Sequence, residues 1–507
     1  MPFAAPPACS RSALHEQLPS RGLPRRRRRG ARCPRARSDL RRNSRTSRRR
    51  CSSTSRRTPA SASSRSSRRS ARPPRIWPCR SASLSPVARC APRARSARRP
   101  TLPARARRRS SEPRAQVLFD PTRHVALTET RWDEAQARAA IEAITREVDA
   151  SFDDRTLWPR HPMDGGPGAA PLKSLYFGAA GVIWAQTYLA ERGAAKTRSW
   201  ASLAGPLVEH YRAAPDTEST LPSYWLGEVG VLLTAWRLDR GAIDLDSLYR
   251  LIEGNIDNPA NEALLGAPGT MLAALFIHEA TGQVRWRELF DANVAALMAR
   301  WTRRERVGCS LWTQDLYGDL SDQIGAGHGM AGNAFAILRG GPNAEARQRA
   351  AEALRATALE SGALVNWPQY AITPRPGRTD RLVQWCHGAP GMITALSDAI
   401  DDDESDRLLR AGGELIWAAG PLAKGAGLCH GTAGNGYAFL KLFRRTGDER
   451  WLDRARCFAM HAIEQSAQLV AQYGRRRFSL WTGDPGVAVY LHTCIAGEAD
   501  VPTLDVF

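Results

Sequence analysis

Lysine is missing and acidic residues are scarce in the first 115 residues of this 507-residue chain. That stretch holds 34 Arg, no Lys and only three acidic residues, a net charge of +31. Because the whole chain carries +23, residues 116–507 carry −8. A strongly basic chain ordinarily suggests binding to nucleic acid or to an anionic membrane surface. Here the positive charge belongs to one terminal stretch, so no nucleic-acid binding is expected of the folded part.

Residues 1–116 also lack periodic apolar residues and are rich in Arg, Ser and Pro. Such a composition cannot bury enough apolar surface to offset chain entropy, so we predict a disordered segment. Three interpretations stay open: a disordered tail, a targeting segment, or GC-rich DNA translated upstream of the true start. The length and the many prolines fit an organelle transit peptide poorly, and no apolar core of a secretory signal follows the amino terminus.

Long apolar runs and closely spaced cysteines are absent as well. No uninterrupted apolar run reaches about 18 residues, so the sequence predicts no membrane span. Residues 117–507 hold five scattered cysteines, and nothing in their spacing requires an oxidising compartment. We therefore expect a cytoplasmic protein. Three of these cysteines, Cys309, Cys457 and Cys494, have no metal-capable neighbours and are expected to be reduced core or helix residues.

An internal repeat runs through residues 117–507. Each of seven copies holds Gly-x-x-Gly directly before an apolar segment, and 39 to 63 residues separate one copy from the next, enough for two helices and their loops. The first glycines of the copies are Gly178, Gly227, Gly266, Gly329, Gly388, Gly431 and Gly483. The pattern predicts an all-α domain of seven helix-pair repeats with few strands.

Single helices can be placed inside this pattern. A first helix is predicted over residues 133–150. After Gly434 a helix should run to about Arg445 and end at Gly447, and a second should carry Trp451 and Phe458 on its apolar face. The same Thr-Gly-x-x-x-Trp spacing follows Gly269.

Repeats of paired helices usually form open solenoids that bind partners, but three consecutive copies carry chemistry. Histidine directly precedes the first glycine at His328, His387 and His430, and cysteine precedes two of these histidines at Cys386 and Cys429. Two Cys-His-Gly triplets in equivalent loops indicate metal binding, and thiolate with imidazole favours zinc. The ligand set stays open at this point, because Cys386, His387, Cys429 and His430 could also form a closed structural site.

The motifs WCHGAPG at residues 385–391 and GLCHGTAGNGYAFL at residues 427–440 resemble the lanthionine synthetase C-like (LanC-like) family, and the resemblance covers residues 117–507. It implies an α/α toroid, or double α-barrel, of seven inner and seven outer helices. The loops before the inner helices would then converge on one central cavity.

The resemblance also implies a site and a reaction. Zinc would be held by Cys386, Cys429 and His430, with a fourth position left for a substrate thiol, as in catalytic zinc sites. The thiol would add to the β-carbon of a dehydroalanine or dehydrobutyrine residue and give a thioether. His328 matches the family's proton-handling histidine, and Glu262 stands where lantibiotic cyclases carry an important aspartate. We therefore expect both to be catalytic.

At two positions this chain departs from the pattern of the lantibiotic cyclases, and these departures favour another branch of the family. Cyclases carry tyrosine and arginine where this chain has His387 and Leu382. Cys-His at both positions looks more like members that add glutathione to dehydroamino acids in damaged proteins, and Lys424 matches a glutathione-contacting lysine there. His387 and Lys424 are thus expected to contact substrate. The partners implied are glutathione or a peptide cysteine, and a peptide or protein with a dehydroamino acid.

Two alternatives stay open beside glutathione addition. One is a lanthipeptide cyclase that closes lanthionine rings within one peptide. The other is a non-catalytic scaffold in which zinc only staples neighbouring repeats and the domain binds a peptide or protein. Glycoside hydrolysis, which other α/α toroids perform, ranks below both, because the repeat loops share no pair of carboxylates.

Overall fold

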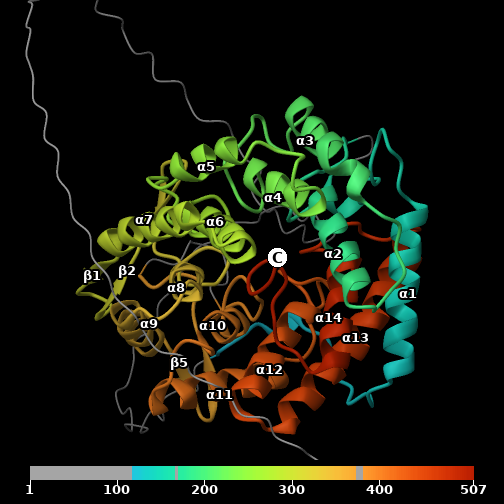
Figure 1. Ribbon diagram of the computed structural model, residues 1–507. Coiled ribbons are helices and arrows are strands. Elements are labelled where there is room, and N and C mark those ends of the chain that lie inside the picture. Colours follow the sequence, from blue (N-terminus) through green and yellow to red (C-terminus); the bar gives the residue numbers. More distant parts are fainter. Residues whose placement is uncertain (1–116, 166–168, 373–380) are drawn as a thin grey trace, which may run out of the picture. The chain divides into compact units, whose positions relative to one another are not determined.

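A computed structural model describes residues 117–165, 169–372 and 381–507 of the chain (Figure 1). The N-terminal segment that was predicted to be disordered lies outside the described residues. Fourteen α-helices dominate the described ranges, and strands are limited to six of three residues each. The prediction of a mostly helical domain is confirmed.

Seven of these helices are almost completely buried, and each begins directly after the first glycine of one repeat copy, which is its N-cap. A helix that is apolar on all sides must be enclosed by other elements. All eight residues of α10 are buried. We call these seven the inner helices: α2 (Ala179–Glu191), α4 (Glu228–Leu238), α6 (Ala267–Thr281), α8 (Met330–Arg339), α10 (Ala389–Leu396), α12 (Thr432–Thr446) and α14 (Asp484–Ala496).

The other seven helices bury one face each, and we call them the outer helices. In α1 the buried side chains include Ala137, Ile141, Ile144 and Val148, which recur at helical spacing. Polar and charged residues fill the opposite faces. The outer helices are α1 (Glu134–Ala150), α3 (Ala204–Ala213), α5 (Leu245–Glu253), α7 (Val284–Arg300), α9 (Ala344–Ala356), α11 (Asp403–Ala419) and α13 (Glu449–Tyr473).

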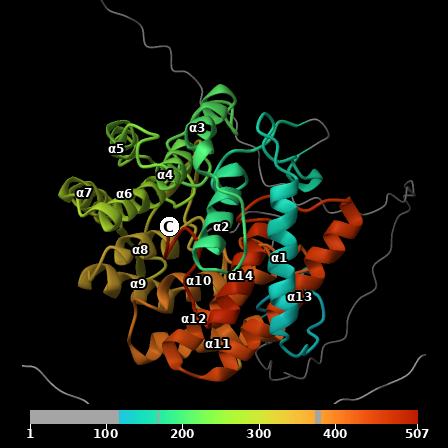
Figure 2. The ribbon, with the colours of Figure 1, turned by 45° about the vertical axis from the view of Figure 1, so that its right-hand side comes forward.

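The inner helices contact one another in a closed cycle. Each packs against the next inner helix along the chain, and α14 packs against α2. Every outer helix contacts at least one inner helix, and α1 packs mainly along α14, while Gln186 of α2 donates to the Thr145 carbonyl of α1 at 3.0 Å. Figures 1 and 2 show α1 beside α13 and α14. The seventh helix pair is therefore formed by the first and last helices of the domain.

Helix boundaries agree with the predictions. The helix predicted over residues 133–150 is α1, with Asp133 as N-cap. α12 ends at Gly447 and α6 at Gly282, both in the left-handed conformation at φ 66° and 68°. Glycine adopts this conformation without steric cost, which explains the recurring Thr-Gly spacing. Trp451 and Phe458 lie on the buried side of α13.

The second glycine of each copy is required by close packing. A Cβ atom on Gly391 would lie 2.2 Å from the carbonyl oxygen of Trp385, and one on Gly434 only 1.6 Å from that of Leu428. The loop before each inner helix thus folds back onto the first helical turn. This contact fixes the residues just before the first glycine against the end of the helix.

The strands form three antiparallel hairpins in the two longest intervals between copies. They are β1 (Thr302–Arg304) with β2 (Cys309–Leu311), β3 (Gln314–Leu316) with β4 (Asp319–Ser321), and β5 (Leu359–Ser361) with β6 (Leu364–Asn366). Short 3-10 helices span Pro121–Arg123, Pro162–Asp164 and Ala201–Leu203. The extra length of these two intervals therefore goes into hairpins.

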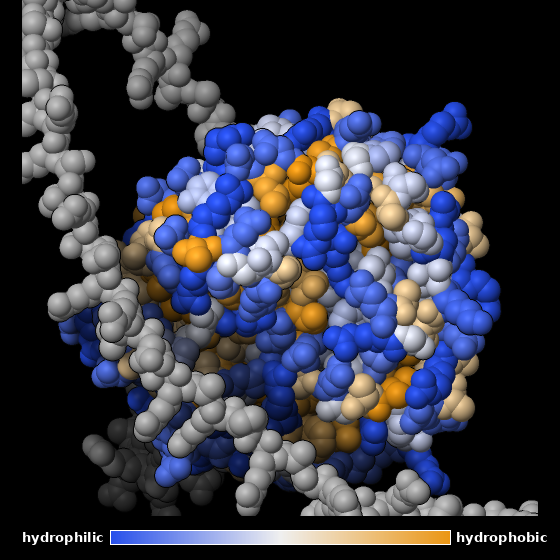
Figure 3. Space-filling model, in the orientation of Figure 1, coloured by the Kyte–Doolittle hydropathy of each residue, from blue (hydrophilic) through white to orange (hydrophobic). Residues whose placement is uncertain are grey.

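The last ten residues return to the middle of the cycle of inner helices, where both ribbon views place the C-terminus (Figures 1 and 2). Phe507 packs on Phe276 of α6 at 5.6 Å between ring centroids, and the Tyr224 hydroxyl donates to the Thr503 carbonyl at 2.7 Å. On the face shown in Figure 3, hydrophilic residues predominate and apolar ones are scattered. Within the described ranges, none of the helices combines the length and apolarity that a bilayer crossing requires.

Candidate metal centre

All seven predicted site residues lie in the loops before four consecutive inner helices. Glu262 precedes α6, His328 precedes α8, Cys386 and His387 precede α10, and the remaining three precede α12. The last group consists of Lys424, Cys429 and His430. Because these inner helices contact one another side by side, their preceding loops meet at one end of the cycle.

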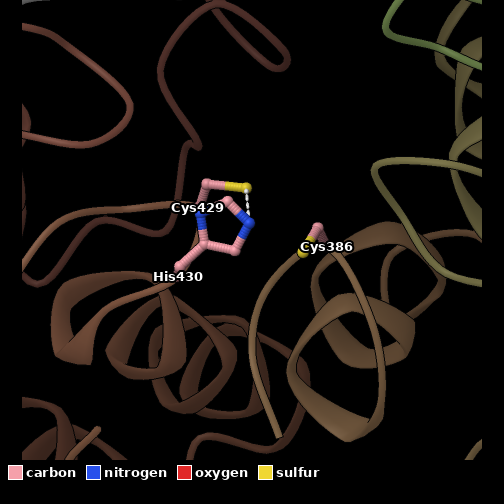
Figure 4. A group of neighbouring side chains, drawn as sticks. All are labelled: Cys386, Cys429 and His430. Atoms are coloured by element: carbon pink, nitrogen blue, oxygen red, sulfur yellow. Dashed lines mark hydrogen bonds between the residues drawn. The ribbon is translucent and has the colours of Figure 1, made fainter. Parts of the chain in front are cut away.

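Cys386, Cys429 and His430 form a group that can hold a metal ion. One ligand atom from each lies within 4.8 Å of the others, and both thiols are buried (Figure 4). Cys429 Sγ lies 3.5 Å from His430 Nε2, and these two residues share a loop, whereas Cys386 comes from another. The Cys429 amide also donates to the Trp481 carbonyl at 2.8 Å, which ties this loop to the one before α14.

The two thiols differ in their tendency to ionise. Burial opposes ionisation of Cys386, but a hydrogen bond from Cys429 and the fields of His430 and His387 outweigh it, so the pKa of Cys386 lies well below its usual value. Burial and the neighbouring Cys386 raise the pKa of Cys429 well above its usual value. The two thiols therefore influence each other, and ionisation of Cys386 is favoured over ionisation of Cys429.

His387 is not part of the metal-capable group. Its Nε2 lies 3.3 Å from the amide nitrogen of Gln369, and its buried Nδ1 has no hydrogen-bond partner among the described residues. Burial, together with the charges of His328 and His430, lowers the pKa of His387 to about 4, against the opposing charge of Cys386. The imidazole is therefore neutral at neutral pH. Its ring lies 5.6 Å from that of His328, with 20° between the planes.

His328 and Glu262 form a hydrogen-bonded pair next to the metal-capable group. His328 Nδ1 lies 2.9 Å from Glu262 Oε2, and Glu262 also accepts hydrogen bonds from the amides of Leu264 and Leu265. Glu262 is fully buried, whereas the His328 side chain is 30% exposed. Burial lowers the pKa of His328, but the hydrogen bond and charge of Glu262 and the charge of Cys386 raise it above 6.5 overall. Because Nδ1 faces Glu262, Nε2 is the ring nitrogen that can face a substrate, and within the described part of the chain it forms no hydrogen bond.

Lys424 stands apart from this cluster. Its side chain is exposed in the loop before α12, and its positive charge opposes the rise in the pKa of Cys429. The lysine therefore lies within electrostatic reach of the metal-capable group without a direct bond to it.

Three residues near the site escaped sequence reasoning. The Gln384 amide donates to Cys386 Sγ at 3.0 Å, and Arg123 donates to Gln384 Oε1 at 3.3 Å. Tyr317 forms the tip of the β3–β4 hairpin at φ 61°, and burial and the charge of Glu262 raise its pKa. Gln384 stands four residues before a first glycine, as Glu262 does, and this shared position was the one available signal.

Comparison with known proteins identifies the family. The model described as "Lanthionine synthetase C-like protein" matches residues 170–506. The chain belongs to this family. That match includes all seven repeat copies and confirms the resemblance found in the sequence.

Several named proteins are similar to this LanC-like chain. "LanC-like protein GCL1" from Arabidopsis thaliana is 33% identical over 236 residues, which cover 44% of this chain and 53% of that protein. "Glutathione S-transferase LANCL1" from Danio rerio is 34% identical over 191 residues, which cover 36% of this chain and 43% of that protein. The chain thus spans about half the length of the curated relatives it matches.

Among solved structures, "Nisin cyclase" matches with a TM-score of 0.49 and 13% identity. That match covers 73% of this chain and 96% of the other.

Proposed function

We propose that this protein is a zinc-dependent enzyme that adds a thiol, principally glutathione, to dehydroalanine or dehydrobutyrine residues and forms thioethers. The proposal rests on one observation: the metal-capable group and the His328–Glu262 pair lie close together at one end of the inner helices. The metal-capable thiols Cys386 and Cys429 lie beside His430, and His328 is held by Glu262 within electrostatic reach of Cys386. A group that activates a thiol and a group that moves a proton are what thiol addition needs.

The residues present fit zinc. Two thiols and one imidazole form a donor set that zinc prefers, and their spacing admits one ion. Three protein ligands would leave a fourth position for a substrate thiol. Cys386, Cys429 and His430 would hold the ion. When bound, zinc would lower the pKa of a substrate thiol and so supply the thiolate nucleophile at neutral pH.

The addition balances without a leaving group. The substrate S–H proton is lost, a bond forms between sulfur and the β-carbon, the C=C π bond breaks, and a proton reaches the α-carbon. His328 would hold and deliver that proton from Nε2, because Glu262 occupies Nδ1. The fully buried Glu262 carboxylate fixes the ring and favours its protonated form. His387 would remain neutral and contact substrate from its place beside His328, 5.6 Å away between ring centroids.

Glutathione is the preferred thiol for two reasons. The Danio rerio relative carries the name glutathione S-transferase, and Lys424 presents an exposed positive charge close to Cys429, suited to a glutathione carboxylate. We further infer that the closed cycle of inner helices is an α/α toroid, with its loops gathered around one cavity. The proposed location is the cytoplasm, where glutathione is reduced.

Metal analysis of the purified full chain tests the ligand set. We expect one zinc per chain, with most of it lost in Cys386→Ala and in Cys429→Ala but retained in His387→Ala. His387 is the matched control, because it neighbours a ligand yet lies outside the group. An empty site in His387→Ala would establish a closed four-ligand site and remove the catalytic proposal.

A dehydroalanine-containing peptide, offered with free glutathione or with an internal cysteine, tests the substrate. We expect intermolecular addition to be faster. Lys424→Ala should weaken glutathione use about fivefold, the worth of one partly solvated ion pair, and leave the metal content unchanged. His328→Ala should slow both additions by about 10²- to 10⁴-fold with metal in place.

Lys196, an exposed lysine outside these loops, provides the control for Lys424. Equal glutathione use by Lys424→Ala and Lys196→Ala would reject the role of Lys424. Rapid ring closure without a glutathione adduct would favour the cyclase alternative. If the metal-loaded protein forms neither product, the non-catalytic scaffold is the alternative that remains.

A further inference from the structure

Gln384 contacts a predicted metal ligand directly. The side chain is 5% exposed, and its Nε2 donates to Cys386 Sγ at 3.0 Å. A hydrogen bond from an amide to a ligand sulfur fixes the direction of the sulfur lone pairs. It also withdraws electron density from a thiolate.

Arg123 fixes the orientation of the Gln384 amide. Amide oxygen and nitrogen are hard to distinguish by shape, but a guanidinium can only donate. Arg123 donates to Gln384 at 3.3 Å, so the amide oxygen must face Arg123. The amide N–H2 group then faces Cys386.

The repeat register shows that Gln384 is not needed to close its own loop. At the same position in other copies, Ser223 Oγ accepts from the amide of Leu226 at 2.8 Å, and Ser174 Oγ accepts from that of Phe177. In the loop before α10, the backbones of Gln384 and His387 exchange hydrogen bonds of 3.1 and 3.0 Å instead. The Gln384 side chain is thereby left for Cys386.

Arg123 reaches the site from a segment far away in the sequence. Residues 123–125 are fixed against the end of α11 and the loop before α12. His124 Nδ1 lies 2.9 Å from the Gly420 carbonyl, and the Val125 amide donates to the Pro421 carbonyl at 2.9 Å. The Ala423 amide donates to the Arg123 carbonyl at 3.0 Å. The backbone that carries Arg123 is therefore fixed, and its guanidinium reaches Gln384 from this anchored position.

We propose that Gln384 and Arg123 are positioning residues of the metal centre, in which Arg123 orients the Gln384 amide and the amide donates to the Cys386 sulfur. The inference rests on the proposed zinc site and deepens it. Hydrogen-bond partners of metal ligands set ligand orientation and basicity, and their removal typically lowers metal affinity about 10- to 100-fold. Gln384 and Arg123 do not touch the reacting atoms.

The test uses the full chain with Zn²⁺ and with Co²⁺ as a spectroscopic substitute. Gln384→Leu keeps most of the side-chain volume and removes the donor. We expect about 10- to 100-fold weaker zinc binding. We also expect the sulfur-to-cobalt charge-transfer band to move to lower energy, because the sulfur regains electron density. Arg123→Leu should produce a smaller shift in the same direction, and Arg123→Lys, which can still donate, should restore part of it.

His124→Ala is the matched control, because it removes a neighbouring anchor of the same segment without touching Gln384. An equal band shift in His124→Ala and Arg123→Leu would assign the effect to docking of the segment and overturn the role of Arg123. Unchanged affinity and spectrum in Gln384→Leu would overturn the proposal while the zinc site stands. A wild-type chain that binds neither metal would remove the proposed function itself.

Discussion

Replacement of Gly434 by alanine gives a direct test of how the repeat loops are held. Gly434 is the third residue of α12, and an added Cβ would lie 1.6 Å from the carbonyl oxygen of Leu428. Ordinary van der Waals contact begins near 3.4 Å, so about 1.8 Å of relief is required. Because the obstacle is backbone, the loop itself has to move. Leu428 directly precedes the predicted ligand Cys429.

Two effects of opposite sign decide the outcome. Alanine is preferred over glycine inside a helix by about 0.5–1 kcal/mol. Overpacking that forces backbone shifts costs about 1–3 kcal/mol, and a displacement of this size belongs at the upper end. We expect Gly434→Ala to lower the free energy of unfolding by about 2 kcal/mol in urea titrations, the upper-end cost less the helix preference of alanine, and to reduce the metal content.

Gly205 in α3 supplies the matched control, because nothing lies within 4 Å of a Cβ added there. Gly205→Ala should therefore stabilise the fold by about 0.5–1 kcal/mol and leave the metal content unchanged. If Gly434→Ala proves as stable as Gly205→Ala, the second glycine of the repeat is not required by close packing, and this account of the loops is wrong.

Two further predictions concern buried charges. The pKa of His328 in the folded state is raised above 6.5, so its pair with Glu262 stabilises the fold fully below pH 6.5 and loses this effect as the pH rises through the folded pKa. In urea titrations, Glu262→Gln should therefore lower the free energy of unfolding most at low pH. A difference that does not change with pH would contradict the pairing. Lys441 is fully buried, and its Nζ lies 2.5 Å from Asp398 and 2.9 Å from Asp505. Lys441→Met should lower the free energy of unfolding by about 3 kcal/mol, and adding Asp505→Asn should recover part of this loss. A loss below about 1 kcal/mol would show that these ion pairs behave as surface pairs.

The repeat pattern was predictable because the backbone positions that define it require glycine, which is visible directly in the sequence. Only glycine tolerates the close approach of Trp385 and Leu428 to the second glycine of their copies, and only glycine adopts the left-handed end of α12 without cost. Spacing therefore located every inner helix and the loop before it. The repeat register also brought Cys386, His387, Cys429 and His430 together as candidate ligands. The family resemblance then selected Cys386, Cys429 and His430 among them.

Contacts between distant segments could not be read in this way. Arg123 meets Gln384 across 261 residues, and α1 packs on α14 at the other end of the domain. No local sequence pattern predicts that Phe507 packs on Phe276 in the middle of the inner helices either. Each of these depends on where the chain closes on itself, which periodicity does not specify.

A comparison of equivalent positions in the repeat loops explains why only some copies carry the metal-capable thiols. The residue two before the first glycine is cysteine at Cys386 and Cys429, but aromatic at Tyr176, Trp225 and Trp481. Trp481 lies 5.1 Å from Trp225 between ring centroids and 6.0 Å from Tyr176, and its carbonyl accepts from the Cys429 amide. The aromatic copies thus pack directly against the copies that carry the thiols. Because apolar rings exclude water, charges beside them interact more strongly than at an open surface. Substitution at one repeat position therefore supplies both the thiols and the dry surroundings that shift their ionisation.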